Sequence, residues 1–347
     1  MSSGKTLRLE YVTPSELQSR KAQGVLGAAA FDGGAHASNG TPVEFPCAHV
    51  HAQVLSDSRE VLELWRTDAP TQSNSHGRVR YARGGDFLFG SLAVYEGEHT
   101  DSAWSPRTPL ESATDLAYRE MYAALAAAGI PQLVRVWNYI PDINIDTHGL
   151  ERYRQFNTAR HEASLASGRA VSGSVPAASA LGAATGSPLT IYFLACHRAP
   201  AFIENPRQVS AYRYPAQYGP RSPAFSRATV LGEGSEATLF ISGTASIVGH
   251  RTLHAGDPAA QTRETLVNIE ALLGEAGRWA GRGTLRLERL AYKVYVRDPR
   301  ELPAIRAELE AALGSNAALL YLQADICRQD LAVEIEAVGG FGWQPGE

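Results

Sequence analysis

The run ATLFISGTASI at residues 237–247 decides how the second half of this chain is expected to fold. It is apolar and strand-like, and a polar stretch separates it from a helical pattern at residues 259–276. In that pattern Leu266, Ile269 and Leu272 fall on one face, as in a helix packed on a sheet. The half continues with an alternating run at residues 287–296, a second helical stretch at 302–313 and strand-like runs at 318–326 and 331–338.

The first half repeats this order of elements. Residues 87–95 are strand-like, residues 110–128 are helical, and Gly129 is a suitable helix C-cap. A strand-like run at residues 133–140 and a helical pattern at residues 150–166 follow. We therefore predict an α+β fold of two related modules, each a mixed sheet with helices packed on one face. The alternative is the ordinary alternation of any α+β chain.

The repeat predicts three segments along the chain. Residues 1–165 form an N-terminal module with an N-terminal extension, and residues 189–347 form the C-terminal module. The segment between them, residues 166–188, contains the run SGSVPAASALGAATGSP, which is rich in small residues. Such a composition is typical of a flexible linker, although a serine before a proline also fits an ordered helix start that faces a ligand. Both interpretations stay open.

Charge and cysteine content exclude several classes of protein. The 347 residues carry 32 basic and 36 acidic side chains, a net charge of −4, so no positive field is available to bind nucleic acid. Cys47, Cys196 and Cys327 are an odd, scattered set, which favours a reducing compartment. Neither a signal-peptide pattern nor a membrane-spanning apolar run is present, so we expect a cytoplasmic protein without a membrane partner. Two modules in one chain further predict a monomer or a weak oligomer.

Common catalytic and cofactor motifs are absent. Cys47, His49 and His51 form a C-x-H-x-H run, but no second ligand pair lies at zinc-site spacing, and alternate strand positions explain them equally well. No G-x-S-x-G elbow occurs, and Gly232 and Gly234 lack the third glycine of a dinucleotide-binding loop. We therefore expect neither a metal nor a cofactor.

Two segments offer groups that bind a small dicarboxylate. The irregular segment SAYRYPAQYGPRSPAFSRA, residues 210–228, is stiffened by three prolines. It contains arginine, tyrosine and serine donors suited to carboxylates, namely Tyr212, Arg213, Tyr214, Tyr218, Arg221, Ser222 and Arg227. A helix face carries Tyr153, Phe156, Asn157 and Arg160. The alternatives are a proline-stiffened surface loop and an ordinary amphipathic helix.

The last strand supplies the candidate general acid. In RQDLAVEIEAVG the pattern alternates, so Glu334 and Glu336 lie on the face opposite Val333 and Ile335. Acids at such positions usually face solvent. If this face lies against the other module, however, burial raises the pKa of a carboxyl from about 4.3 toward neutrality, as a general acid requires.

The C-terminal half resembles the RidA/YjgF family. The similarity lies in LFISGTASIVG (239–249), QTRETLVNIEALLGEAG (261–277), YKVYVRDPRELPAI (292–305) and VEIEAV (333–338). The whole chain resembles the chorismatases, a family built on that fold. The pieces that carry this second resemblance are RVWNYIPDIN (135–144), ERYRQFNTAR (151–160), PAASALG (176–182), YGPRSPAFSRA (218–228) and GTASIVGH (243–250).

The resemblance implies a reaction and a set of site residues. Chorismatases remove the enolpyruvyl group of chorismate as pyruvate, and one branch leaves 3-hydroxybenzoate, a product that fits starter-unit supply in secondary metabolism. The resemblance implies that Glu334 protonates the enol ether and that Cys327, on the penultimate strand, marks this branch. The expected substrate-binding residues are Arg160, Tyr212, Arg213, Tyr214, Tyr218, Arg221, Ser222 and Gly243. The alternatives are a hydrolytic chorismatase that leaves a dihydroxycyclohexadiene carboxylate, and a RidA-like binder without turnover.

Overall fold

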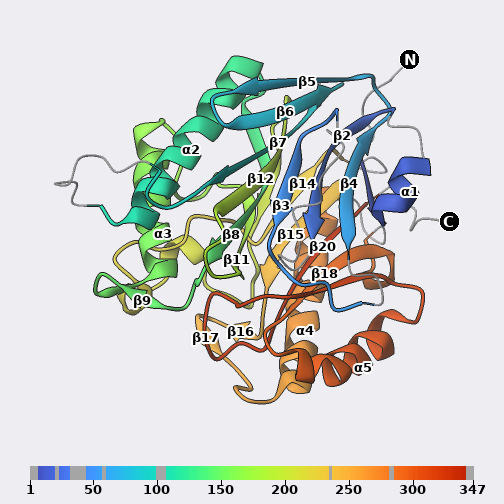
Figure 1. Cartoon of the computed structure of the whole chain (residues 1–347). Helices are drawn as coiled ribbons and strands as arrows, with labels where there is room; N and C mark the ends of the chain where they lie inside the picture. The colour runs from blue at the N-terminus through green and yellow to red at the C-terminus, as the bar shows by residue number, and fades with distance from the viewer. Residues whose placement is uncertain are drawn as a thin grey trace.

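Three larger sheets, two of them covered by helices on their outer faces, form most of the described molecule (Figure 1). The computed structural model describes residues 7–19, 23–31, 44–56, 60–98, 107–233, 237–280 and 285–340. In the part of the chain thus described, no helix is long and apolar enough to cross a membrane.

Two six-stranded sheets have matching strand orders. In the first, the order is β11 (Ala177–Ala183), β8 (Gln132–Pro141), β12 (Leu189–Cys196), β7 (Phe87–Val94), β6 (Val79–Gly84) and β5 (Thr71–His76). In the second, read the same way, it is β19 (Ala318–Gln323), β18 (Leu290–Val296), β20 (Val333–Gly340), β15 (Thr238–Thr244), β14 (Ala228–Leu231) and β13 (Ala201–Ile203). The β8–β11 and β18–β19 pairs are parallel, so both sheets are mixed.

The chain visits these strands in the same order in both modules. Counting only the strands of the two six-stranded sheets, each module contains three strands, a helix, a fourth strand, a second helix and two final strands, in that order along the chain. The helices are α2 (Pro109–Ala128) and α3 (Arg152–Ala166) in the first module, and α4 (Pro258–Ala280) and α5 (Leu302–Leu313) in the second. The predicted internal repeat and the α+β fold class are therefore confirmed.

The boundary expected between the modules is wrong. Residues 166–188, expected to be a linker or a helix start, contain β11, and residues 189–196 form β12 in the middle of the first sheet. These two strands correspond to the last two strands of the second module. The Ala, Gly and Ser content of β11 serves close packing, because a Cβ at Gly182 would lie 2.6 Å from Cβ of Asp325.

Strand β11 also joins the two modules. It is the edge strand of the first sheet, and hydroxyl groups of the second module accept hydrogen bonds from its backbone. The N–H of Ala177 donates to Oγ1 of Thr229, and that of Ala178 donates to Oγ of Ser242, both at 2.9 Å. A sheet edge that is usually left to solvent is thus covered by the other module.

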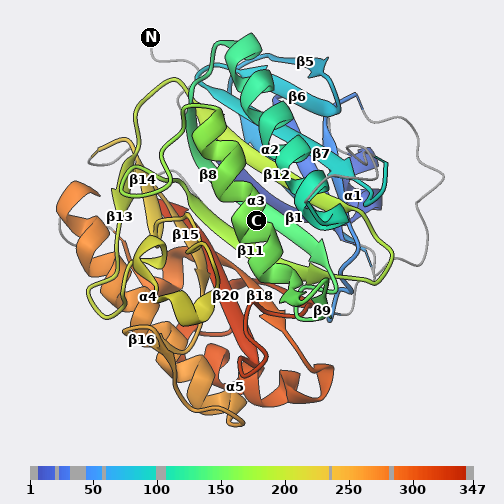
Figure 2. The same cartoon turned by 90° about the vertical axis from the view of Figure 1, so that its left-hand side faces the viewer.

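The helices cover the outer face of each six-stranded sheet. Figure 2 shows α2 and α3 lying over the first sheet. Helices α4 and α5 lie on the face of the second sheet that is turned away from the first module (Figure 2). Thr108 and Glu111 form a capping box at the start of α2, and Gly129 ends it in the left-handed conformation at φ 69°. The predicted C-cap at Gly129 is therefore confirmed.

A four-stranded sheet fills the space between the inner faces of the two modules. Its order is β1 (Leu7–Val12), β4 (Val61–Thr67), β2 (Val25–Phe31) and β3 (Cys47–Val50), and α1 (Pro14–Ser19) follows β1. Trp65 of β4 packs against Trp137 of β8 and Phe240 of β15, so the three sheets share one aromatic core. Two short pairs, β9 (Asp146–Thr147) with β10 (Leu150–Glu151) and β16 (Ile247–Val248) with β17 (Arg251–Thr252), complete the fold.

Candidate active site

A cavity of about 500 Å³ lies between the two modules. Helix α3 and strand β11 line it from the first module, and strands β15 and β20 with the loops at residues 211–227 and 324–332 line it from the second. Its size is that of a small-molecule site. The five sequence pieces typical of chorismatases all contribute wall residues, among them Asn144, Arg160, Ser179, Arg227 and Gly243.

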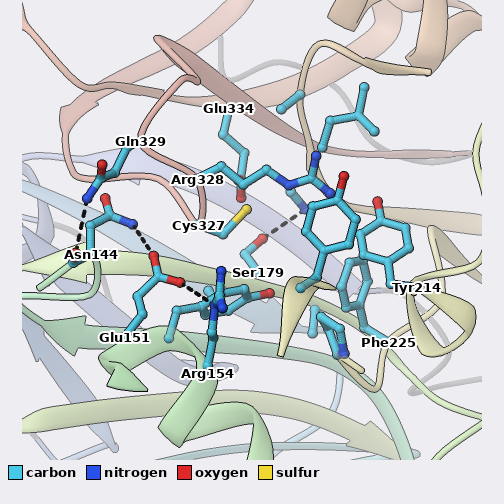
Figure 3. A pocket seen from close by; sticks show the side chains of 18 of the residues that line it. Asn144, Glu151, Arg154, Ser179, Tyr214, Phe225, Cys327, Arg328, Gln329 and Glu334 are labelled. Atoms are coloured by element: carbon cyan, nitrogen blue, oxygen red, sulfur yellow. Dashed lines mark hydrogen bonds and ion pairs between the residues drawn. The ribbon is translucent and has the colours of Figure 1, made fainter. Parts of the chain in front are cut away.

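Glu334 is the buried acid of this cavity. It lies on β20, where Val333 and Ile335 pack with the helices of the second module and Glu334 and Glu336 lie on the opposite face of the strand, as predicted. Its side chain points into the cavity beside Cys327 (Figure 3). Burial and then the neighbouring Glu336 raise the pKa of Glu334 from 4.5 to about 8, against the opposite effect of Arg135, Arg227 and Arg297. The carboxyl is therefore protonated at neutral pH and can donate a proton.

Gly243 makes room for that carboxyl group. It lies where the pairing of β15 with β20 shifts register between Ile241 and Thr244, a β-bulge. A Cβ at this position would overlap Oε1 of Glu334. The backbone N–H of Gly243 donates to Oγ of Ser179 at 2.9 Å. The glycine thus allows the acid to lie directly against the backbone of the other strand.

Cys327 lines the cavity, but not from the strand on which it was expected. The penultimate strand, β19, ends at Gln323, and Cys327 lies in the loop that leads to β20. Burial and then Glu334 raise the pKa of the Cys327 thiol to about 12. The side chain is therefore a neutral thiol rather than a nucleophilic thiolate.

Three arginines line the cavity, Arg160 and Arg227 with buried side chains and Arg328 with a half-buried one. Among the described residues, Nε of Arg160, Nε of Arg227 and Nη2 of Arg328 have no hydrogen-bond partner. Buried guanidinium donors are rarely left unpaired, and they match carboxylate oxygens in charge and geometry. We therefore take these three arginines as the candidate binding groups for an anion with more than one carboxylate.

Aromatic side chains hold two of these arginines in place. Arg328 stacks over Tyr218 at 4.3 Å, and its Nη1 donates to the backbone oxygen of His250 at 3.0 Å. Nη2 of Arg227 donates to Oη of Tyr214 at 2.8 Å, and its guanidinium lies 5.2 Å from the Phe225 ring. Fixed guanidinium planes lose little conformational freedom when a ligand binds.

The structure brings together only part of the predicted site. Six of the predicted residues line the cavity: Arg160, Tyr214, Tyr218, Gly243, Cys327 and Glu334. The other four, Tyr212, Arg213, Arg221 and Ser222, lie outside its lining. Arg213 and Arg221 are exposed, and Oγ of Ser222 donates to the backbone oxygen of Tyr214, so this serine shapes the loop.

Three other wall residues are absent from the expected set of substrate-binding residues. Arg227 is among the carboxylate donors of residues 210–228 but not in that set, and neither Arg328 nor Ser179 is predicted from the sequence. Ser179 lies in a chorismatase-like piece, which was a usable signal, whereas Arg328 lies in no such piece. At the rim, Arg154 pairs with Glu151 at 3.0 Å, and Gln329 donates to the backbone oxygen of Asn144 (Figure 3).

Glu336 differs sharply from Glu334, although it lies only two residues away on the same face. Nη2 of Arg135 and Nζ of Lys293 each lie 2.8 Å from one of its oxygens. Burial acts to raise the pKa of Glu336, but Lys293 and Arg135 together lower it below its ordinary value. One acid of the pair is therefore an anion and the other is neutral.

Comparison with known proteins finds similarity along most of the chain. Residues 63–195 match the family described as chorismatase FkbO/Hyg5-like, N-terminal, a range that ends within β12. A 3-hydroxybenzoate synthase from Streptomyces hygroscopicus is 39% identical over 296 residues, which cover 82% of this chain and 83% of the relative. A chorismatase from Streptomyces rapamycinicus is 38% identical and covers 84% of this chain and 86% of its own length. A solved chorismatase structure superposes with a TM-score of 0.87 at 32% identity, covering 98% of this chain and 100% of the other.

Proposed function

Because the chain belongs to the chorismatase family, we propose that it cleaves chorismate to 3-hydroxybenzoate and pyruvate. The observation that carries this proposal is the neutral carboxyl of Glu334 in a cavity lined by three arginines, each of which has an N–H group without a hydrogen-bond partner. A protein that only binds an anion gains nothing from an adjacent carboxyl group. A protein that protonates an anionic substrate needs both the cationic groups that bind the substrate and the carboxyl group that donates the proton.

Glu334 acts as the general acid. Its proton goes to the methylene carbon of the enol ether, and the enolpyruvyl group becomes an oxocarbenium ion. The raised pKa keeps the proton available near pH 7, and burial keeps water from taking it. The resulting Glu334 carboxylate lies close to the new positive charge.

Arg160, Arg227 and Arg328 orient the substrate through its two carboxylates. Arg160 lies on α3, whereas Arg227 and Arg328 lie in loops of the second module, so the substrate bridges the two modules. Charge-assisted hydrogen bonds to fixed guanidinium groups hold the enol ether against Glu334. Tyr214 and Tyr218 support this grip by holding Arg227 and Arg328.

The branch that leaves 3-hydroxybenzoate consumes no water, because an oxygen of the substrate ring reacts internally. The similarity to a 3-hydroxybenzoate synthase supports this branch. Cys327 lies beside Glu334, where an uncharged, apolar thiol keeps water from the cation. In the hydrolytic branch, water attacks the cation instead and the ring remains a diol.

One incubation tests both the substrate, chorismate, and the assigned product branch. The purified protein is incubated with chorismate, pyruvate is followed with lactate dehydrogenase, and the second product is separated by chromatography. We expect equal amounts of pyruvate and an aromatic phenol. Release of pyruvate with a cyclohexadiene diol contradicts the assigned branch and keeps chorismate as substrate. Absence of pyruvate contradicts the proposal as a whole.

A further inference from the structure

A second cluster of charged groups lies behind the cavity, and the proposed reaction does not touch it. We call it the buried quartet: Glu63 of β4, Arg135 of β8, Lys293 of β18 and Glu336 of β20. Each of the four side chains is at least 95% buried. They come from all three sheets and meet in the aromatic core.

The quartet is fully paired. Lys293 forms ion pairs with both Glu63 and Glu336, and Arg135 completes the row on the other side of Glu336. Glu336 also accepts hydrogen bonds from Nε1 of Trp137 at 2.7 Å, from Oγ of Ser179 at 2.8 Å and from Oη of Tyr295 at 3.3 Å. With two negative and two positive charges, the cluster is neutral and rigid.

Stability alone is a weak reason for such a cluster. The free energy lost when four charges are removed from water is about as large as the free energy gained from their pairing. A protein with apolar side chains of similar volume in their place is often as stable. The quartet does touch the cavity wall. Oγ of Ser179, a wall residue, donates to Glu336 and accepts from the backbone N–H of Gly243, the residue against which Glu334 lies.

We propose that Glu336 is a positioning residue, whose fixed negative charge holds the proton on Glu334 until the substrate takes it. The inference rests on the proposed function in that Glu334 is taken to be the acid. Glu336 does not reach the cavity and acts only through Glu334. Lys293 and Arg135 keep Glu336 ionised, and Arg135 also limits its effect because it attracts the Glu334 carboxylate.

Other charged or titratable groups around Glu334 have defined effects. Arg227 and Arg297 favour its ionised form, as Arg135 does, and Glu336 opposes it. Two further neighbours, the Cys327 thiol and the Tyr153 phenol, have pKa values raised by burial and are neutral. Among the groups that act most strongly on Glu334, Glu336 is therefore the one that favours the protonated form.

Two substitutions are expected to act in opposite directions. Glu336→Gln removes the negative charge and leaves Arg135 and Lys293 with excess positive charge, so Glu334 loses its proton at a lower pH. Arg135→Gln removes a positive charge, so Glu334 keeps its proton to a higher pH. General loss of stability does not produce shifts of opposite sign.

The readout is the infrared C=O band of the protonated carboxyl, assigned to Glu334 by difference against Glu334→Gln in each background. In the wild type the band is expected to disappear with a midpoint near pH 8. We expect the midpoint to fall by about one pH unit or more in Glu336→Gln and to rise in Arg135→Gln. Glu63→Gln is the matched control, because Glu63 contacts Lys293, Trp65 and Tyr192 at the far end of the quartet, and it should shift the midpoint less.

Three results overturn the inference: a wild-type midpoint near 4.5, an unchanged midpoint in Glu336→Gln, or shifts of the same sign in both variants. If Glu336→Gln does not fold, Arg135→Gln decides by its upward shift or the absence of one. The band needs no substrate, so the result is separate from the proposed function. Pyruvate release with an unchanged Glu336→Gln midpoint refutes this inference alone, and opposite shifts without pyruvate release refute the proposed function alone.

Discussion

Replacing Glu334 with glutamine should make the stability of the protein less dependent on pH. Glutamine has the shape of a protonated glutamate but does not ionise. Below pH 4.5 the carboxyl is protonated in both the folded and the unfolded chain. As the pH rises, the unfolded chain loses this proton first, because burial holds the folded pKa at about 8. The wild type therefore has a stabilising contribution that is full below pH 4.5 and is lost as the pH approaches 8.

The size of the effect follows from the two pKa values. A shift from 4.5 to about 8 corresponds to about 5 kcal/mol over the whole range, at about 1.4 kcal/mol per pH unit. Urea unfolding of the wild type and of Glu334→Gln can be measured at pH 5 and at pH 7.5. Between these two pH values the stabilising contribution of Glu334 is expected to change by about 3 kcal/mol. The free energy of unfolding of the wild type should fall by that amount relative to Glu334→Gln. A difference between the proteins that is the same at both pH values refutes a buried, neutral Glu334, whatever happens to turnover.

Four other substitutions test the walls of the cavity. Arg227→Ala and Arg328→Ala should each raise KM for chorismate roughly 10- to 100-fold, since each removes a charge-assisted hydrogen bond, whereas Arg213→Ala and Arg221→Ala, which change exposed arginines outside the cavity, should leave KM unchanged. Equal effects in the two sets would contradict the assignment. Gly243→Ala should lower kcat roughly 100-fold with a smaller change in KM, because the new methyl group displaces the Glu334 carboxyl group. Full activity in a folded Gly243→Ala protein would show that the Glu334 carboxyl group lies elsewhere. Cys327→Val should shift the products toward the diol if this side chain controls the access of water, and chromatography showing an unchanged mixture would remove it from that role.

The sequence predicted the features that depend on periodicity. The alternation of Val333, Glu334, Ile335 and Glu336 determines which face each side chain occupies, and the repeated helices allowed the two modules to be recognised. Strand β11 was missed because small residues have no apolar alternation, and a flexible linker has the same composition.

Side-chain direction in an irregular loop could not be predicted in the same way. Arg213, Arg221 and Arg227 lie within fifteen residues of one another, and only Arg227 lines the cavity. Without a repeating backbone geometry, spacing does not determine which side each residue faces. The unpaired N–H groups that mark the arginine site depend on contacts between distant segments, as when the backbone oxygen of His250 holds Arg328.

The position of β12 has a consequence for how the protein is made. Strands β7 and β8 are not paired with each other, because β12 lies between them and bonds to both. A nascent chain that has emerged only as far as α3 therefore has the first module without its central strand. That module closes only when Cys196 has left the ribosome, and β13 of the second module follows at Ala201. Residues 197–200 are consequently the place to divide the gene if the halves are to be produced separately and recombined.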